Sequence, residues 1–267
     1  MGEPQLLASG GTEVDLFVLG PWIAGLSVAI SVLGALVGFA CIVHSVRSAR
    51  FRLVWLTAAA VSIGGIGIWL ATSVTLLGLD VSSTVLRYDL AYQIAALVVA
   101  FATVLIGLLL LGRSFRLPLL LAGGLVMGLG TATTLYLSLG SISVQGKVDI
   151  SPWPAALAAV VAVLVCGGAL WSFQSLRGGP ARAATTLLFG LGIAGVYYLG
   201  LSALEFEVDP TATAPDGMEL FDFVFPMFVV GLLSLTIPIS AVLIAPDRRA
   251  LAATAPAPRP EHLEPAR

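Results

Sequence analysis

Threonine, serine and tyrosine side chains follow a pair of glycines at three places in this 267-residue sequence. The pairs begin at Gly65, Gly128 and Gly190, which are 63 residues (65 to 128) and 62 residues (128 to 190) apart. The hydroxyl-bearing residues after them are Thr72, Ser73, Thr133, Thr134, Tyr136, Tyr197 and Tyr198. Hydroxyl groups both donate and accept hydrogen bonds. The constant spacing indicates a repeated structural unit, in which these side chains can form a polar cluster that binds a small neutral ligand.

The same residues also have a structural explanation. The paired glycines are Gly65 and Gly67, Gly128 and Gly130, and Gly190 and Gly192. Small residues let neighbouring membrane helices approach closely. A threonine can return its hydrogen bond to the backbone carbonyl four residues earlier, and tyrosines gather at membrane interfaces. Both interpretations stay open at the level of the sequence.

The elements that carry these residues are predicted to be membrane-spanning helices. The sequence is 58% hydrophobic and 10% charged, with a mean hydropathy of +1.01, which no water-soluble domain shows. Seven continuous apolar stretches can each cross roughly 30 Å of hydrocarbon. They are residues 20–46, 51–77, 90–112, 115–139, 152–176, 183–204 and 218–245. The predicted fold is an all-α, polytopic bundle of seven helices, because strands of a membrane barrel would alternate apolar and polar residues.

The basic residues predict the orientation of the bundle. Eleven of the thirteen Lys and Arg residues fall on one side: Arg47, Arg50, Arg52, Arg113, Arg116, Arg177, Arg182, Arg248, Arg249, Arg259 and Arg267. Only Arg87 and Lys147 fall on the other side. Cytoplasmic loops retain basic residues, so we expect the N-terminus outside and the C-terminus inside.

This topology predicts three parallel two-helix repeats followed by a seventh helix. The second, fourth and sixth helices carry the glycine pairs and run from the cytoplasm outwards, so the hydroxyl groups should meet near the outer surface. We expect a short external segment over residues 1–16, the membrane domain over 17–249 and an Ala- and Pro-rich tail over 250–267. That tail is too short for an enzyme domain, and the first helix should be retained because no basic segment precedes it.

Catalysis has little support in the sequence. The first six apolar stretches carry no Asp, Glu, Lys or Arg in their central parts, where an ionisable residue would indicate function. This argues against a proton pump, an ion-coupled transporter or an intramembrane protease. The acidic loop 205–222 lacks the spacing of a calcium site and is predicted to be solvated. We therefore expect no enzyme and no catalytic residue.

The chain resembles the MHYT family of bacterial integral-membrane sensor domains, whose repeat runs Gly-x-Gly, three residues, then Met-His-Tyr-Thr-Gly-Met. Supporting features are Trp69, the Tyr88-Asp89-Leu90 start of the third helix and the Pro152-Trp153 start of the fifth. The resemblance covers about residues 17–249. It implies seven helices in a bacterial plasma membrane, with an external-facing site proposed to bind copper and to sense a diatomic gas.

The sequence departs from the family at the positions expected to hold the metal. Methionine is replaced by Ala71, Thr134 and Val196, and histidine by Thr72, Leu135 and Tyr197. Tyrosine is kept at Tyr136 and Tyr198 but is Ser73 in the first repeat, and the motif glycine is kept only at Gly200. Copper prefers thioether and imidazole ligands, for which hydroxyl groups are poor substitutes. We therefore expect no metal and no cofactor.

The resulting hypothesis is a non-enzymatic membrane sensor or accessory signalling protein of MHYT-like architecture that has lost its metal site. Its expected partners are the lipid bilayer and a cytoplasmic or membrane signalling protein, with no nucleic acid. Two alternatives stay open. One is a small permease built around the axis of the three helix pairs, and the other is a structural partner of a membrane complex.

Overall fold

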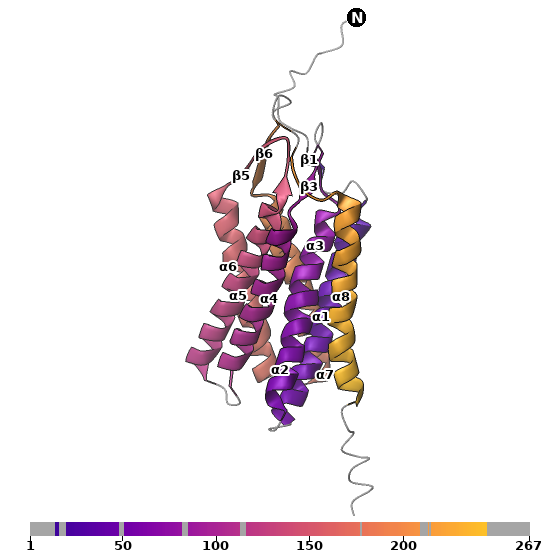
Figure 1. Cartoon of the computed structure of the whole chain (residues 1–267). Coiled ribbons are helices and arrows are strands. Elements are labelled where there is room, and N and C mark those ends of the chain that lie inside the picture. Colours follow the sequence, from indigo (N-terminus) through magenta and orange to yellow (C-terminus); the bar gives the residue numbers. More distant parts are fainter. Residues whose placement is uncertain are drawn as a thin grey trace, which may run out of the picture.

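The computed structural model describes residues 14–15, 20–47, 51–81, 85–112, 116–176, 178–208, 213 and 215–244. The predicted tail over 250–267 and most of the predicted external segment over 1–16 lie outside these residues. The described part of the chain is a bundle of long helices with short strands at one end (Figure 1).

Seven helical spans in the described residues are long and apolar enough to cross a membrane, which confirms the predicted number. The first is α1 (Trp22–Arg47), and the second is a continuous span made of α2 (Arg52–Ala60), η1 (Val61–Leu70) and α3 (Ala71–Leu76). The others are α4 (Leu90–Leu110), α5 (Leu117–Gly140), α6 (Pro152–Ser175), α7 (Gly179–Leu201) and α8 (Leu220–Ile244). Each lies within a few residues of its predicted apolar stretch.

Local sequence signals account for several helix ends. Asp89 precedes α4, and its side-chain oxygen accepts a hydrogen bond from the backbone N–H of Ala91 at 2.7 Å, as a helix N-cap does. Proline stands in the first turn of α5, α6 and α7, where its missing N–H would have no partner within the helix. Pro226 and Pro238 lie inside α8, as predicted.

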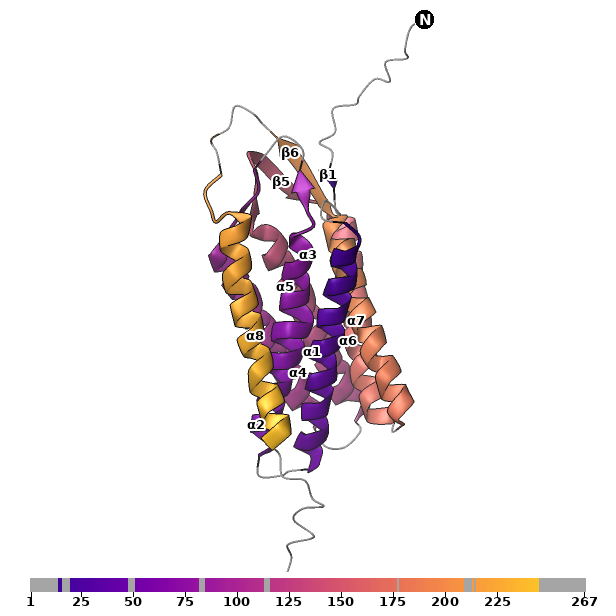
Figure 2. The ribbon, with the colours of Figure 1, turned by 90° about the vertical axis from the view of Figure 1, so that its right-hand side faces the viewer.

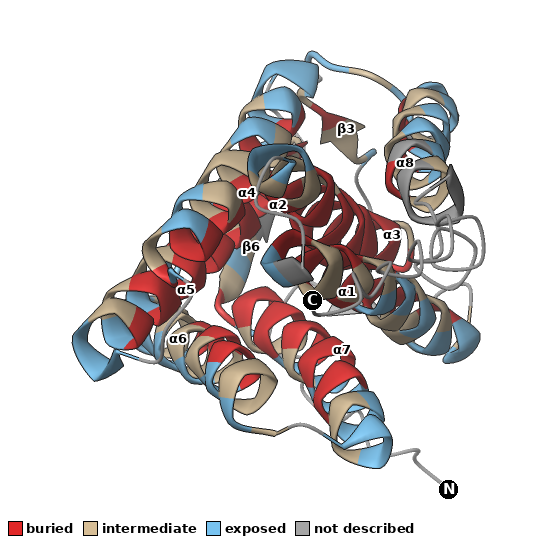
Figure 3. Ribbon diagram, turned by 90° about the horizontal axis from the view of Figure 1, so that it is seen from below, coloured by how far each residue is buried: buried red, intermediate tan, exposed pale blue. Residues whose placement is uncertain are grey.

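The helices form three hairpins and a closing helix. α1 packs on the second span, α4 on α5, and α6 on α7, while α7 returns to α1 to close the ring. α8 packs against η1 and α1 (Figure 2). Buried residues face the interior of this arrangement and exposed residues face outwards (Figure 3). The three two-helix repeats and the additional helix are therefore confirmed.

Three short antiparallel sheets lie at one end of the bundle, which we call the strand end (Figure 1). β1 (Val14–Asp15) pairs with β2 (Asp80–Val81), β3 (Arg87–Tyr88) with β4 (Ile142–Ser143), and β5 (Gly146–Ile150) with β6 (Leu204–Val208). No strand was predicted in these segments, and β6 begins at the edge of the segment 205–222 that was predicted to be a solvated loop. They join one repeat to the next, since β3 follows the first repeat and β4 and β5 follow the second.

The opposite end, which we call the basic end, carries Arg52, Arg116 and Arg182 at the starts of α2, α5 and α7. At the strand end, Arg87 forms an ion pair with Glu219 at 3.0 Å. Described acidic residues all lie at the strand end or in the first turns of α8. The asymmetry of charge that predicted the orientation is therefore also an asymmetry between the two ends of the folded bundle.

One helical segment differs from the prediction of a regular second helix. η1 is a π-helix, in which N–H groups bond to the carbonyl five residues earlier, and it contains the first glycine pair. The corresponding glycines of the second and third repeats lie in α-helices. Side chains in this π-helix are almost all buried.

Candidate functional site

The motif glycines of the second repeat lie where α5 packs between two neighbours. A side chain at Gly128 would overlap the backbone of Val163 on α6, and one at Gly130 would overlap Thr103 on α4. Two residues along an α-helix turn by about 200°, at 3.6 residues per turn, so the two glycines face nearly opposite sides. They let α5 approach both neighbours closely, as small residues do in membrane helices.

The third repeat uses its glycines in the same way. A side chain at Gly190 would overlap Val32 on α1, and one at Gly192 would lie 2.6 Å from Val165 on α6. α7 is thus held between the first helix of its own repeat and the first helix of the chain. For these two repeats the geometry supports the structural explanation of the glycine pairs.

The first repeat places its glycines differently. The nearest atoms that a side chain at Gly65 would meet are 3.8 Å away, and those at Gly67 are 3.4 Å away. The tight contact moves to Gly64, where a side chain would lie 2.6 Å from the carbonyl oxygen of Ala100 on α4. A π-helix changes the angle between successive residues, so glycines at the same spacing face different neighbouring helices than they do in an α-helix.

The three threonines of the predicted cluster bond to their own helices. Thr72 donates to the carbonyl of Ile68 at 2.6 Å, Thr133 to that of Leu129 at 2.9 Å, and Thr134 to that of Gly130 at 2.9 Å. All three bonds run four residues back, as expected for threonine in a membrane helix. Thr72 and Thr134 are buried, whereas Thr133 is exposed and lies apart from them.

The tyrosines have different surroundings. Tyr136 donates a hydrogen bond to the carbonyl of Ala155 at 2.6 Å and so joins α5 to α6. Tyr197 is 2% exposed, and its hydroxyl group has no hydrogen-bond partner among the described residues. The Tyr197 ring meets the ring of half-buried Tyr198 edge to face, with 6.1 Å between centroids. The seven predicted residues therefore do not form one connected cluster.

A hydrogen-bonded network outside the predicted cluster connects the first and second repeats. Gln93 on α4 donates to Ser141 at 2.8 Å, and Ser73 lies 3.4 Å from the Gln93 side-chain oxygen. The indole N–H of Trp69 donates to the backbone carbonyl of Gln93 at 3.1 Å. Gln93 is 1% exposed. Its polar side chain within an apolar span was the signal that could have revealed it, because such groups need partners in a membrane.

A second pair of hydroxyl groups joins the two helices of the first repeat. Thr75 donates to the Ser27 hydroxyl at 3.0 Å, and Ser27 donates to the carbonyl of Ala71 at 2.9 Å. Tyr88 of β3 lies above them, with its hydroxyl 3.4 Å from the carbonyl of Leu76 and its ring stacked on Phe223 of α8. Polar contacts of the strand-end half therefore concentrate around the second span.

The positions expected to hold a metal in the family all face the interior. They are Ala71, Thr134 and Val196 in place of methionine, and Thr72, Leu135 and Tyr197 in place of histidine, and every one is buried. None offers a sulfur or an imidazole nitrogen, and the Thr72 and Thr134 hydroxyls already donate to carbonyls. The residues present do not fit a copper ion. Within the described part of the chain, no three His, Cys, Asp or Glu residues are grouped as metal ligands would be.

Comparison with known proteins agrees with the repeat architecture. The pattern of the MHYT family, described as "Bacterial signalling protein N terminal repeat", matches residues 128–186, which cover the glycine pair of the second repeat. The chain is 30% identical over 166 residues to the bifunctional diguanylate cyclase/cyclic di-GMP phosphodiesterase MucR of Pseudomonas aeruginosa, a match that covers 60% of this chain and 24% of MucR.

A second relative is an uncharacterized signaling protein of Caulobacter vibrioides. It is 33% identical over 100 residues, which cover 36% of this chain and 12% of that protein. The chain thus spans only a minor part of the length of both relatives, and no solved structure matches it significantly. The apolar helices and these signalling relatives indicate a multi-pass bacterial membrane protein, and residues 128–186 match the repeat of the MHYT family.

Proposed function

We propose that this protein is a non-enzymatic sensor or accessory signalling protein whose three repeats no longer hold a metal. The proposal rests on the side chains that occupy the six positions expected to hold a metal in the family. Three of these positions are hydrocarbon, at Ala71, Leu135 and Val196, and two are threonines bonded to their own helices. Such side chains support packing and hydrogen bonding but not copper coordination.

Two buried hydroxyl groups support a neutral ligand in place of the metal. The Tyr197 and Ser138 side-chain oxygens are buried and have no hydrogen-bond partner among the described residues. Buried polar groups in native structures normally bond to protein, water or a ligand. A small neutral molecule that bonds to either hydroxyl would shift the packing of α7 or α5, and helix movement would carry the signal to a partner protein.

The bacterial inner membrane is the proposed location, with the strand end outside and the basic end in the cytoplasm. The charge distribution supports this orientation, because basic residues are retained in the cytoplasm. Bonded hydroxyls and buried side chains such as Ile66, Leu76 and Leu139 occupy the interior of the described bundle. No observation favours a permease over a sensor.

Metal analysis tests the proposal. Protein purified with copper in the growth medium should carry far less than one copper per chain. The matched variant replaces Thr72, Leu135 and Tyr197 with histidine, and it should gain copper if it elutes as the wild type does in size-exclusion chromatography. One copper bound to every wild-type chain, and lost in Y136F or Y197F, would contradict the proposal.

A further inference from the structure

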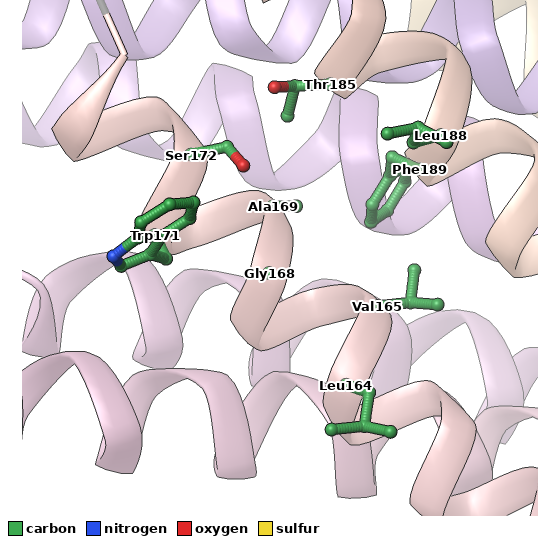
Figure 4. Close-up of a pocket in the computed structure, with 9 residues that line it drawn as sticks. All are labelled: Leu164, Val165, Gly168, Ala169, Trp171, Ser172, Thr185, Leu188 and Phe189. Atoms are coloured by element: carbon green, nitrogen blue, oxygen red, sulfur yellow. The ribbon is translucent and has the colours of Figure 1, made fainter.

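A groove between α6 and α7 lies in the basic half of the bundle, away from the strand-end hydroxyl groups (Figure 4). Its volume is about 440 Å³, within the range of about 300–1,000 Å³ found for ligand sites. α6 contributes Leu164, Gly168, Trp171 and Ser172, and α7 contributes Thr185 and Leu188, among other residues. Apolar side chains form most of the wall.

The groove exists because α6 has a glycine where a side chain would fill the gap. A Cβ atom at Gly168 would meet nothing within 4 Å. Leu164 and Leu188, on the two rims, are each 67% exposed, so the groove opens on the outer surface of the bundle. In a membrane this surface faces lipid.

The end of the groove nearest the basic end is polar. The Ser172 and Thr185 hydroxyls approach each other across the gap from the two helices (Figure 4). Arg182 lies one turn closer to the basic end than Thr185, and its guanidinium carbon is 5.7 Å from the ring centroid of Phe173 on α6. Its Nε atom is buried without a hydrogen-bond partner among the described residues.

Among the described residues, Arg182 also has no acidic partner. The described carboxylates belong to the strand end and the start of α8, and the one described ion pair joins Arg87 to Glu219 there. Arg182 places a positive charge near the start of α7, one turn beyond the groove-lining Thr185. A positive charge at the end of an apolar groove is complementary to a lipid with an anionic phosphate and a hydrocarbon chain.

We propose that the α6–α7 groove is a binding site for an anionic glycerophospholipid. One acyl chain lies in the groove over Gly168, and the phosphate lies at the basic end beside Arg182. The positive charge of the guanidinium group, which has no carboxylate partner among the described residues, attracts the phosphate. This site is separate from the hydroxyl groups of the proposed sensor and does not depend on what they bind.

Native mass spectrometry of the full chain tests this site. Delipidated protein in detergent is titrated with phosphatidylglycerol or with phosphatidylcholine that carries the same acyl chains. Wild-type protein should bind phosphatidylglycerol more tightly. R182Q should weaken phosphatidylglycerol binding about fivefold, the effect of one basic residue at an anionic surface, and should leave phosphatidylcholine unchanged.

Filling the groove provides an independent variant. G168L places a side chain in open space, so the protein should fold, while binding of both lipids should weaken. The matched controls are R116Q, an exposed arginine at the start of α5, and G195L, an exposed glycine of α7 where a Cβ also meets nothing within 4 Å. Both controls should bind lipid as the wild type does. Elution volume and melting temperature verify that each variant is folded.

Several results would overturn the site. Equal wild-type affinity for the two lipids would remove the role of Arg182, and unchanged binding in G168L would remove the role of the groove. Glycerol phosphate, which has no acyl chain, should fail to compete, and effective competition would show a phosphate site alone. Dimers that G168L abolishes, in place of lipid adducts, would identify the groove as a contact between two copies of the chain.

Discussion

The second span, α5 and α7 carry the same glycine pair, but the backbone around it differs between the second span and the other two helices. In α5 and α7 the pair lies in an α-helix, and each glycine prevents an overlap with a neighbouring helix. In the second span the pair lies in the π-helix η1, and the overlap is prevented by Gly64 instead. A repeated sequence motif therefore does not imply a repeated contact.

The second span is also more deeply buried than α5 and α7. The apolar window of the second span is 72% buried, compared with 56% for α5 and for α7. The second span contacts α1, α4 and α8, and the additional contact with α8 has no equivalent in the other repeats. Its polar side chains also bond to other elements, through Ser73 to Gln93 and through Thr75 to Ser27. The first repeat is thus the structural centre of the bundle.

The largest expected change in stability comes from replacing a motif glycine by alanine, and it should differ between the α-helical and the π-helical repeat. Gly128→Ala introduces a methyl group against the backbone of Val163 and should lower the free energy of unfolding by about 1–3 kcal/mol. Gly65→Ala, the equivalent change in the first repeat, meets atoms only at 3.8 Å and should change it by less than about 1 kcal/mol, because alanine favours helix. Thermal unfolding in detergent, followed by size-exclusion chromatography, measures both.

Gly64→Ala completes this comparison. It should destabilise the protein as Gly128→Ala does, because the added methyl group would lie 2.6 Å from a backbone oxygen that cannot move aside. If Gly65→Ala is the more damaging of the two changes in the second span, the π-helical register of η1 is wrong.

A smaller effect is expected where the first and second repeats meet. Gln93→Leu introduces an apolar side chain of similar size and removes the bond to Ser141 and the contact with Ser73, which should lower the free energy of unfolding by about 1 kcal/mol. Thr133→Val is the control, since this exposed threonine bonds only to its own helix. Equal melting temperatures for the two variants would show that the network does not stabilise the bundle.

The smallest effects compare the tyrosines of the second and third repeats. Tyr136→Phe loses the bond to Ala155 and should cost about 0.5–1.5 kcal/mol. Tyr197→Phe removes a buried hydroxyl that has no described partner, so it should leave stability unchanged or raise it slightly. The same thermal measurement distinguishes them. A loss in Tyr197→Phe as large as in Tyr136→Phe would show that a water or another molecule bonds to Tyr197.

The candidate site was predicted only in part. Sequence spacing identified the helices and the depth at which Thr72, Thr134 and Tyr197 lie, because all are buried in the strand-end half of the bundle. It could not show that Thr133 faces outwards or that Gln93 connects two repeats. Both depend on the rotation of each helix about its axis. The packing of glycines and large side chains fixes this rotation, whereas a continuous apolar sequence does not determine it.

By itself, the sequence determined the number, length and pairing of the membrane-spanning helices. Backbone polar groups must bond within each helix when no water is present, so a long apolar stretch has one regular solution. Tertiary structure alone decided the short sheets at the strand end, the π-helix from Val61 to Leu70 and the groove over Gly168. Each of these depends on which surfaces meet across the bundle, and residues far apart in the chain, such as Gly64 and Ala100, set those distances together.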